Sequence, residues 1–169
     1  MRRNGVAAAD REASTMQGST AVIEFLNEAL TAELTAINQY FISAKVAKNW
    51  AYSKLAKDYY EESVDEMKHA ESLIERLLYL EGVPNMQRLF TVQVGEAIIE
   101  QYRLNYDMEK AAVERYQRGV AICHEQGDPG TRTLLEDLLH DEEERVDEIE
   151  GELENLEQLG EGLWLQKWV

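Results

Sequence analysis

Four stretches of this 169-residue chain share one pattern, in which apolar residues recur every three or four positions and a carboxylate replaces them near the middle. That period makes each stretch one face of an α-helix. A buried carboxylate is costly unless a cation or hydrogen bonds compensate its charge. The pattern therefore predicts four helices that bring four carboxylates, and an internal cation, to one level of a shared core.

The four faces consist of Leu26, Leu30, Glu33, Ile37, Tyr40 and Ala44; of Leu55, Tyr59, Glu62, Glu66, His69, Leu73, Leu77 and Leu80; of Ile98, Tyr102, Tyr106, Glu109, Val113, Tyr116, Val120 and Cys123; and of Leu135, Leu138, Glu142, Arg145, Ile149, Leu153 and Leu156.

Helix boundaries can be placed from capping and breaking residues. A Ser-Thr pair begins the first helix, a Gly-Val-Pro sequence ends the second, a glycine ends the third and an Asp-Pro pair begins the fourth. We expect helices over residues 19–50, 51–80, 95–127 and 128–160. The tail, residues 161–169, predicts a short final helix.

The connections between these segments select the topology. The first and second helices are joined by almost nothing, as are the third and fourth, so each pair is an antiparallel hairpin. The link over residues 83–94 can span roughly 40 Å when extended. A helix of about 28 residues has a similar length, about 42 Å. The sequence therefore predicts an all-α four-helix bundle with one long crossover.

The carboxylates form a two-fold repeat. Glu33 precedes Glu66 by 33 residues, Glu109 precedes Glu142 by 33 residues, and the two pairs are offset by 76 residues. His69 follows Glu66 by three positions, which places both side chains on one helix face. One carboxylate on one helix and Glu-x-x-His on the next is the ligand set of half a di-iron carboxylate centre. Carboxylate and imidazole donors suit iron, manganese or zinc.

Arg145 interrupts the repeat, because it stands 76 residues after His69, where a second histidine would complete the site. A guanidinium stays protonated and has no lone pair to give to a metal. His140 lies five residues away on another face of the helix and does not replace it.

Composition excludes several classes of function. The formal charge of −16 argues against DNA or an anionic membrane as a partner and favours cations. No run of about 18 apolar residues is present. The single Cys123 excludes an internal disulfide framework and suits a reducing, cytoplasmic compartment. We expect residues 1–15 to be a disordered extension without an export signal, and residues 16–169 to form one domain.

Segments of the chain resemble the bacterioferritins in order and spacing. They are AELTAINQYF (32–41), ESVDEMKHAE (62–71), LEGVPNMQ (80–87) and DEEERVDEIE (141–150). The resemblance covers about residues 16–169. It implies a ferritin-like bundle, a cytoplasmic cage of 24 subunits that stores ferric mineral, and Fe(II) oxidation by O₂ at a di-iron site in each bundle.

The resemblance also assigns residues. Glu33, Glu66, His69, Glu109 and Glu142 take the metal-ligand positions, with Glu66 and Glu142 as bridging carboxylates, and Tyr40 takes that of a tyrosine beside the centre.

The resemblance further places Met67 as the ligand of a haem b shared by two subunits. Met67 follows Glu66 by about 100° of helix rotation and so points away from the bundle interior. By itself that position favours a methionine in a subunit interface over a haem ligand, because methionine fills irregular contacts well. The segment 34–41 matches the haem-contacting helix through Leu34, Ile37, Asn38 and Phe41. Glu61 and Glu148 depart from the family pattern, as Arg145 does.

Three interpretations of Arg145 follow. It bends to the surface while water fills its place; it pairs with Glu109 or Glu142 as a built-in cation and leaves a mononuclear or inactive centre; or it is a sequence error. In the second interpretation the Glu109 side binds metal weakly, whereas Glu33, Glu66 and His69 still hold one ion.

Four functional hypotheses remain open. The first is an iron-storage subunit with haem and an impaired ferroxidase, supplied with electrons by a ferredoxin-type donor. The second is an active ferroxidase in a homo-oligomer. The third is another di-iron bundle, such as a rubrerythrin-like peroxidase, against which the absence of a Cys-x-x-Cys pair argues. The fourth is a purely structural cage subunit with neither metal nor haem. By analogy with cages built from two bacterioferritin types, the chain could also be the haem-bearing partner in a mixed cage.

Overall fold

The computed structural model describes residues 17–169, so the predicted extension over residues 1–15 lies outside the described residues. The helices are α1 (Thr20–Asn49), α2 (Ser53–Tyr79), α3 (Ile98–Gln126), α4 (Pro129–Leu159) and α5 (Glu161–Gln166). No strand occurs in residues 17–169. The predicted all-α fold is therefore confirmed.

Polar side chains set the helix ends where the sequence predicts them. The hydroxyl of Ser19 accepts a hydrogen bond from the backbone N–H of Val22 at 3.2 Å and caps α1. The carboxylate of Asp128 accepts from the N–H of Thr131 at 2.9 Å and caps α4. Gly127 ends α3 in the left-handed conformation, with φ of 67°.

Helix α3 begins at Ile98, three residues after the predicted start at residue 95. The side chain of Gln101 explains the difference, because its Oε1 accepts a hydrogen bond from the N–H of Gly95 at 2.7 Å. Ala97 then has an extended backbone, with φ of −142° and ψ of 158°. The contact satisfies the Gly95 N–H outside the helix, and helical geometry begins only after Ala97.

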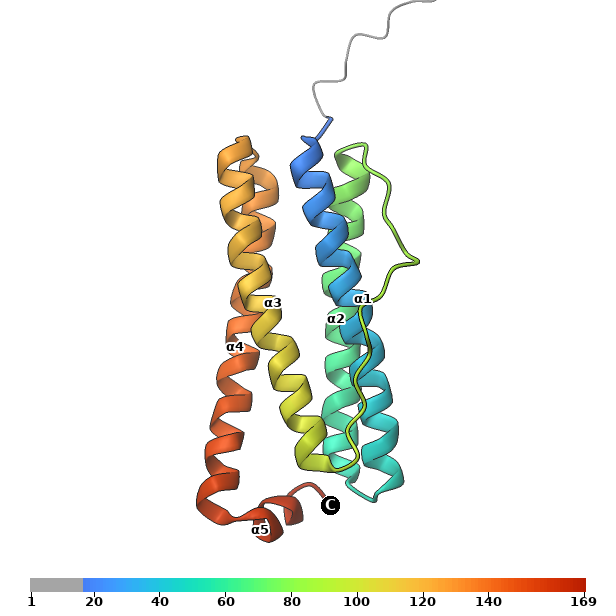
Figure 1. Ribbon diagram of the computed structural model, residues 1–169, viewed down its shortest axis with the longest axis vertical. Coiled ribbons are helices and arrows are strands. Elements are labelled where there is room, and N and C mark those ends of the chain that lie inside the picture. Colours follow the sequence, from blue (N-terminus) through green and yellow to red (C-terminus); the bar gives the residue numbers. More distant parts are fainter. Residues whose placement is uncertain (1–16) are drawn as a thin grey trace, which may run out of the picture.

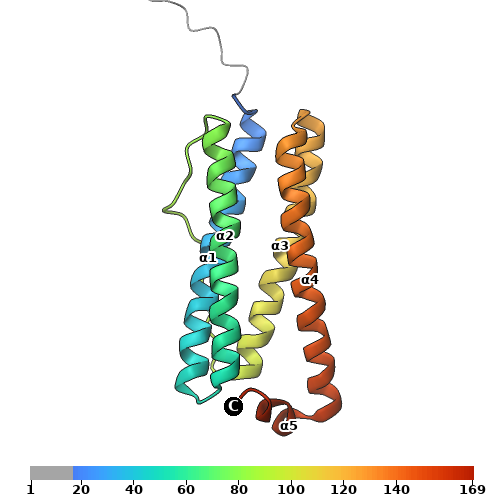
Figure 2. The same ribbon diagram turned by 180° about the vertical axis from the view of Figure 1, so that it is seen from behind.

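The two helical hairpins lie side by side, as predicted. Helices α1 and α2 form one pair and α3 and α4 the other, while residues 80–97 run down the outside of the bundle (Figure 1). The reverse view shows α5 turning beneath the end of the bundle, close to the turn between α1 and α2 (Figure 2). The long crossover makes the third helix parallel to the second, which completes the predicted topology.

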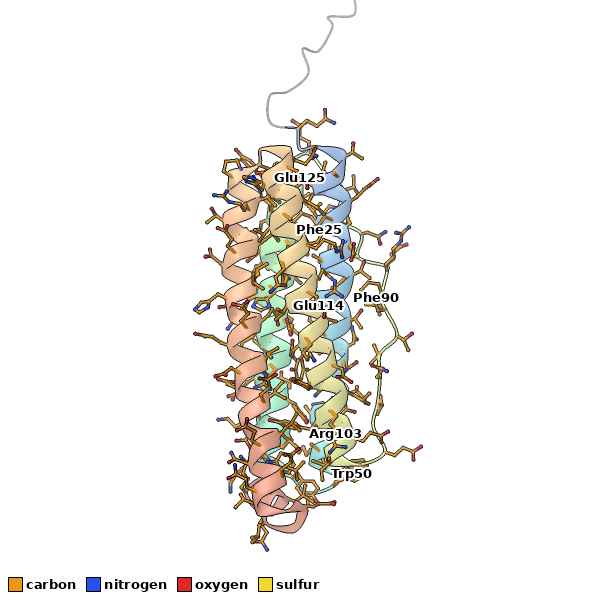
Figure 3. All side chains as sticks on the ribbon, turned by 60° about the vertical axis from the view of Figure 1, so that its left-hand side comes forward. Phe25, Trp50, Phe90, Arg103, Glu114 and Glu125 are labelled. Atoms are coloured by element: carbon orange, nitrogen blue, oxygen red, sulfur yellow. The ribbon has the colours of Figure 1, made fainter. Side chains whose placement is uncertain are left out.

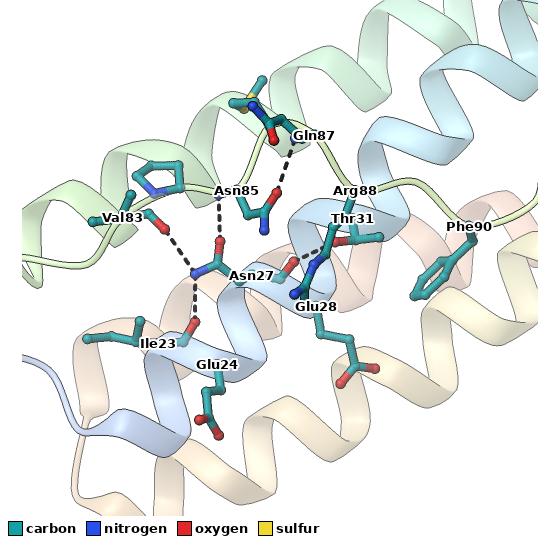
Figure 4. A pocket seen from close by; sticks show the side chains of 12 residues that line it. Ile23, Glu24, Asn27, Glu28, Thr31, Val83, Asn85, Gln87, Arg88 and Phe90 are labelled. Carbon is teal, nitrogen blue, oxygen red and sulfur yellow. Dashed lines mark hydrogen bonds between the residues drawn. The ribbon is translucent and has the colours of Figure 1, made fainter.

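Asn27 of α1 holds the beginning of the crossover. Its Nδ2 donates to the carbonyl of Val83 at 3.2 Å, and its Oδ1 accepts from the N–H of Asn85 at 2.7 Å (Figure 4). A crossover has no ladder or helix to pair its backbone groups, so a side-chain amide that both donates and accepts is a suitable partner.

Two more polar side chains of α1 hold the rest of the crossover. Thr35 accepts at its hydroxyl from the N–H of Phe90 at 2.8 Å, and Gln39 accepts at Oε1 from the N–H of Gln93 at 3.1 Å. The crossover is thus attached along about three turns of α1.

Two apolar clusters fill the bundle, one at each end. The cluster near the start of α1 contains Leu30, Leu73 and Leu138, and the other contains Tyr59 and Ile149. Charged side chains such as Glu114 and Glu125 of α3 point outward (Figure 3). The carboxylates of the repeat occupy the layer between the two clusters.

Trp164 of α5 closes one end of the bundle. Its ring is fully buried, lies 5.2 Å from the ring of Tyr102 in an edge-to-face arrangement, and donates from Nε1 to Glu152 at 3.0 Å. None of the helices in residues 17–169 has a stretch both long and apolar enough to cross a membrane.

Candidate metal centre

All four helices of the bundle contribute to one polar layer. Glu33 comes from α1, Glu66 and His69 from α2, Glu109 from α3 and Glu142 from α4. Each of the four carboxylate residues is at most 3% exposed. The fold thus brings these five side chains into one layer. Buried carboxylates need compensation inside the protein.

His69 faces three of the carboxylates with a single nitrogen. Its Nδ1 lies 3.0 Å from Glu66 Oε2, 3.2 Å from Glu142 Oε1 and 3.7 Å from Glu33 Oε2. The other ring nitrogen, Nε2, lies 3.5 Å from Asp141 Oδ2. Nδ1 of His69 therefore lies where it and the three carboxylates could bind the same cation.

Four of these residues fit a metal ion. Glu33, Glu66, His69 and Glu142 each offer one ligand atom, and those atoms all lie within 4.8 Å of one another. Glu142 Oε1 is buried and faces His69 Nδ1 at 3.2 Å. Three carboxylates and an imidazole match the donor preference of divalent iron, manganese or zinc. That they bind such an ion stays a prediction.

Two tyrosines support the layer from opposite sides. Tyr40 donates its hydroxyl to Glu109, and Tyr116 donates its hydroxyl to Glu33. The sequence placed Tyr40 beside the centre but treated Tyr116 only as part of an apolar face. Its position seven residues after Glu109, on the same helix face, is the signal that could have found it.

Burial raises the pKa of Glu66 well above the usual range, and the charges of Glu142, Glu33 and Glu109 raise it further. Burial and the neighbouring Glu142 raise the pKa of Glu109 in the same way. Burial also raises the pKa of Glu142. Without a metal ion, the layer therefore retains protons that a divalent cation would displace.

Glu33 and His69 behave as the charged partners in the layer. Burial acts to raise the pKa of Glu33, but the contacts with His69 and Glu66 outweigh it and the pKa is lowered. Burial acts to lower the pKa of His69, but the carboxylates of Glu142, Glu33 and Glu66 outweigh it and the pKa is raised. The imidazolium is thus the cation of the layer when no metal is bound.

Arg145 lies beside the layer and is largely, not fully, buried, with 11% of its side chain exposed. Its Nη2 lies 3.5 Å from Asp58, its Nε 3.3 Å from Glu62 and its Nη1 3.2 Å from Glu148. Its guanidinium carbon is 5.8 Å from the centre of the Tyr40 ring. The guanidinium therefore packs between α1, α2 and α4.

Two of the interpretations of Arg145 are wrong in their geometry. The side chain does not bend to the surface, and within residues 17–169 it forms no ion pair with Glu109 or Glu142. The physical reason is that Asp58 and Glu62 lie one turn apart on α2, facing α4. The guanidinium of Arg145 therefore pairs with these two carboxylates and not with Glu109 or Glu142. This acidic pair depends on how α2 and α4 pack, which the spacing within either helix does not reveal.

Met67 points out of the bundle, as its rotation from Glu66 predicts. Its side chain is 47% exposed, and Phe41 and Val64 are exposed as well, at 44% and 36%. A thioether on an open helix face is accessible to a group outside the bundle. Whether that group is haem stays a prediction.

Two cavities reach the layer from different sides. One, of about 210 Å³, lies between α1, α3 and the crossover and is lined in part by Ala36, Phe90 and Glu109. The other, of about 540 Å³, lies between α2 and α4 and is lined in part by His69 and Arg145. The layer is accordingly accessible to small solutes.

Fold and site together define a ferritin-like four-helix bundle with a layer of buried carboxylates at its centre. A family model for the ferritin-like domain matches residues 23–159. A bacterioferritin of Streptomyces coelicolor is 47% identical over 150 residues, which cover 89% of this chain and 90% of that protein. Bacterioferritin BfrA of Mycobacterium tuberculosis is 42% identical over 154 residues, covering 91% and 97%.

A solved structure of Mycobacterium tuberculosis BfrA superposes with a TM-score of 0.88 at 41% identity, covering 90% of this chain and 96% of that one. A mycobacterial bacterioferritin structure gives the same TM-score at 42% identity, covering 90% and 95%. The chain belongs to the bacterioferritin family.

Proposed function

We propose that this chain is an iron-storage subunit of a haem-containing ferritin cage, and that its own metal centre holds one divalent ion. The observation that carries the proposal is the four-residue group of Glu33, Glu66, His69 and Glu142, whose ligand atoms lie within 4.8 Å of one another. Family membership supports the storage role, the 24-subunit assembly and a cytoplasmic location.

Fe(II) is the substrate of the proposed reaction and O₂ the oxidant. His69 gives up its proton and offers a lone pair, while the carboxylates neutralise the charge of the incoming ion. Glu66 and Glu142 would be the bridging carboxylates of a complete pair. Glu109 completes the carboxylate set but lacks an imidazole partner, because Arg145 stands in its place.

Arg145 impairs this chemistry for two reasons. It cannot donate an electron pair to a second iron, and its fixed positive charge repels a divalent ion that approaches Glu109. Reduction of O₂ by two electrons draws one electron from each of two Fe(II) ions. A subunit that binds one ion well and a second one poorly therefore oxidises Fe(II) slowly on its own.

Arg145→His tests this proposal. The variant should gain a fast, O₂-dependent phase that saturates near two Fe(II) per subunit, and the original protein should show only a slow phase. Arg145→Gln serves as the control, because it removes the charge without supplying a strong ligand. A fast phase of full amplitude in the original protein would instead establish the active homo-oligomeric ferroxidase.

For haem, we propose Met67 as the ligand, one from each of two subunits, with electrons supplied by a ferredoxin-type donor. Its exposure of 47% supports this, since a shared group must lie outside the bundle. Protein produced with haem available should have a Soret band that Met67→Leu abolishes. Met86→Leu is a matched control, because Met86 is also exposed but lies on the crossover.

A haem-bearing partner in a mixed cage is the second candidate. It is favoured by the combination of an intact haem-ligand position at Met67 and an incomplete ligand set at Arg145. Co-purification of this chain with a second bacterioferritin type from its native cells would support it. A cage of one subunit type only would exclude it.

A further inference from the structure

Three carboxylates surround the guanidinium of Arg145, and we call Asp58, Glu62 and Glu148 the Arg145 seat. The contacts are 3.5 Å from Nη2 to Asp58, 3.3 Å from Nε to Glu62 and 3.2 Å from Nη1 to Glu148. Each nitrogen of the guanidinium therefore faces a different carboxylate. Two helices supply the seat, because Asp58 and Glu62 belong to α2 and Glu148 to α4.

The seat lies next to the metal layer. Arg145 follows Glu142 by three residues, so the two side chains project from the same side of α4. Its guanidinium carbon is 5.8 Å from the ring of Tyr40, whose hydroxyl donates to Glu109. Burial raises the pKa of Glu109, and the positive charge of Arg145 opposes that rise. The guanidinium is thus within electrostatic reach of the layer without pairing to it.

Without the carboxylates of the Arg145 seat, the guanidinium of Arg145 would form ion pairs with other carboxylates nearby. Arginine has a long, flexible side chain, and a desolvated cation is costly without a partner. The buried carboxylates of Glu142 and Glu109 belong to the adjacent layer, where Glu142 Oε1 lies 3.2 Å from His69 Nδ1. A guanidinium on that oxygen would occupy a ligand atom and place a positive charge beside the metal ion.

We propose that the Arg145 seat is a positioning device for the metal centre. By holding Arg145, it keeps the guanidinium away from Glu142 and Glu109, and so leaves Glu33, Glu66, His69 and Glu142 free to bind one divalent cation. The seat residues touch neither the metal nor the substrate and act through Arg145. This inference rests on the proposed metal centre and specifies which residues keep its ligand atoms free of the guanidinium.

The three seat residues do not contribute equally. The side chain of Glu148 is 69% exposed, so water screens its contact with Arg145. The side chains of Asp58 and Glu62 are 36% and 21% exposed, and their contacts are screened less. The pair on α2 is therefore the effective part of the seat, and Asp58→Asn/Glu62→Gln is the variant that removes its charge while keeping its shape.

Co(II) is a suitable probe, because its visible absorption reports binding without any turnover. We would titrate the metal-free protein with Co(II) at pH 8 and compare four chains: the original, Asp58→Asn/Glu62→Gln, Arg145→Ala, and the triple variant. The seat variant should bind Co(II) at least about tenfold more weakly, which is about 1.4 kcal/mol. The triple variant should bind within about threefold of Arg145→Ala, since no guanidinium is left to move.

Glu61→Gln/Glu143→Gln is the matched control, because it removes two exposed carboxylates from the same two helices and leaves the seat intact. It should bind Co(II) as the original does. Circular dichroism and oligomer size confirm that each variant folds, and Asp58→Asn alone replaces the double variant if that one does not.

The positioning role is refuted if the seat variant binds Co(II) as tightly as the original does. It is also refuted if the triple variant binds Co(II) as weakly as the seat variant. Neither result contradicts the proposed metal centre. If neither the original nor Arg145→Ala binds Co(II), the metal centre itself is refuted and the seat proposal falls with it.

Discussion

The two halves of the polar layer use the same scaffold with different cations. The first half, Glu33 with Glu66 and His69, contains an imidazole that can release its proton and become a ligand. The second half, Glu109 with Glu142 and Arg145, contains a guanidinium that keeps its charge at every accessible pH. One residue in a repeated pattern therefore separates a half whose cation can lose its proton from a half whose cation is permanent.

The halves also differ in where the cation lies. His69 is placed among the carboxylates, with Nδ1 3.0 Å from Glu66. Arg145 is held outside them by the seat, 3.3 Å from Glu62. A cation that is to be exchanged for metal belongs within the ligand set, whereas a permanent one is tolerated only when other anions hold it.

The largest expected effect comes from the first half. Glu66→Gln removes the central carboxylate and should weaken Co(II) binding by on the order of 100-fold or more, since even residues beyond the ligands contribute 10- to 100-fold. Co(II) titration by visible absorption measures this. Glu71→Gln, on the exposed face of α2, is the control. Equal affinities in the two variants would remove Glu66 from the ligand set.

A second prediction concerns stability on the Arg145 side. Burial raises the pKa of Glu62 to about 7 from 4.5. Between these values the unfolded chain ionises Glu62 while the folded protein keeps it protonated, so stability falls as pH rises through this window.

Glu62→Gln removes that loss. It should leave the free energy of unfolding nearly unchanged at pH 4.5 and raise it by about 2 kcal/mol at pH 8, after allowing for partial solvent screening. Urea denaturation at the two pH values measures the difference. A variant less stable than the original at pH 8 would show that the contact with Arg145 outweighs the burial of the charge.

A third prediction uses the two tyrosines. Tyr116→Phe removes the hydrogen bond to Glu33, a member of the four-residue group, and should weaken Co(II) binding about tenfold, because a hydrogen bond to a charged group contributes about 1.5–3 kcal/mol. Tyr40→Phe alters Glu109, which lies outside that group, and should weaken it less than about threefold. A larger loss of Co(II) affinity in Tyr40→Phe than in Tyr116→Phe would place the bound ion on the Glu109 side.

Much of this centre could be predicted because its residues repeat along the chain. The spacing of Glu33, Glu66, Glu109 and Glu142 predicts the layer, and the lengths of the connections between the helices predict the bundle that forms it. His69 follows from its three-residue distance to Glu66. These features depend on periodicity within helices, which a sequence displays directly.

What the sequence could not predict depends on contacts between helices. The ion pair of Arg145 with Asp58 joins residues 87 positions apart and depends on the register of α4 against α2. The attachment of the crossover by Asn27 and Gln39 is of the same kind, because any polar side chain on α1 could equally face solvent. No periodicity marks such residues.

The short turns within each hairpin and the long crossover between the hairpins have a consequence for the order of folding. Each hairpin can form from local contacts, but the carboxylates of α1 and α2 meet those of α3 and α4 only when the hairpins dock. The cost of burying these carboxylates together therefore opposes the last assembly step. A divalent ion that bridges Glu66 and Glu142 would join the two hairpins, so we expect refolding to be faster in its presence than with a chelator.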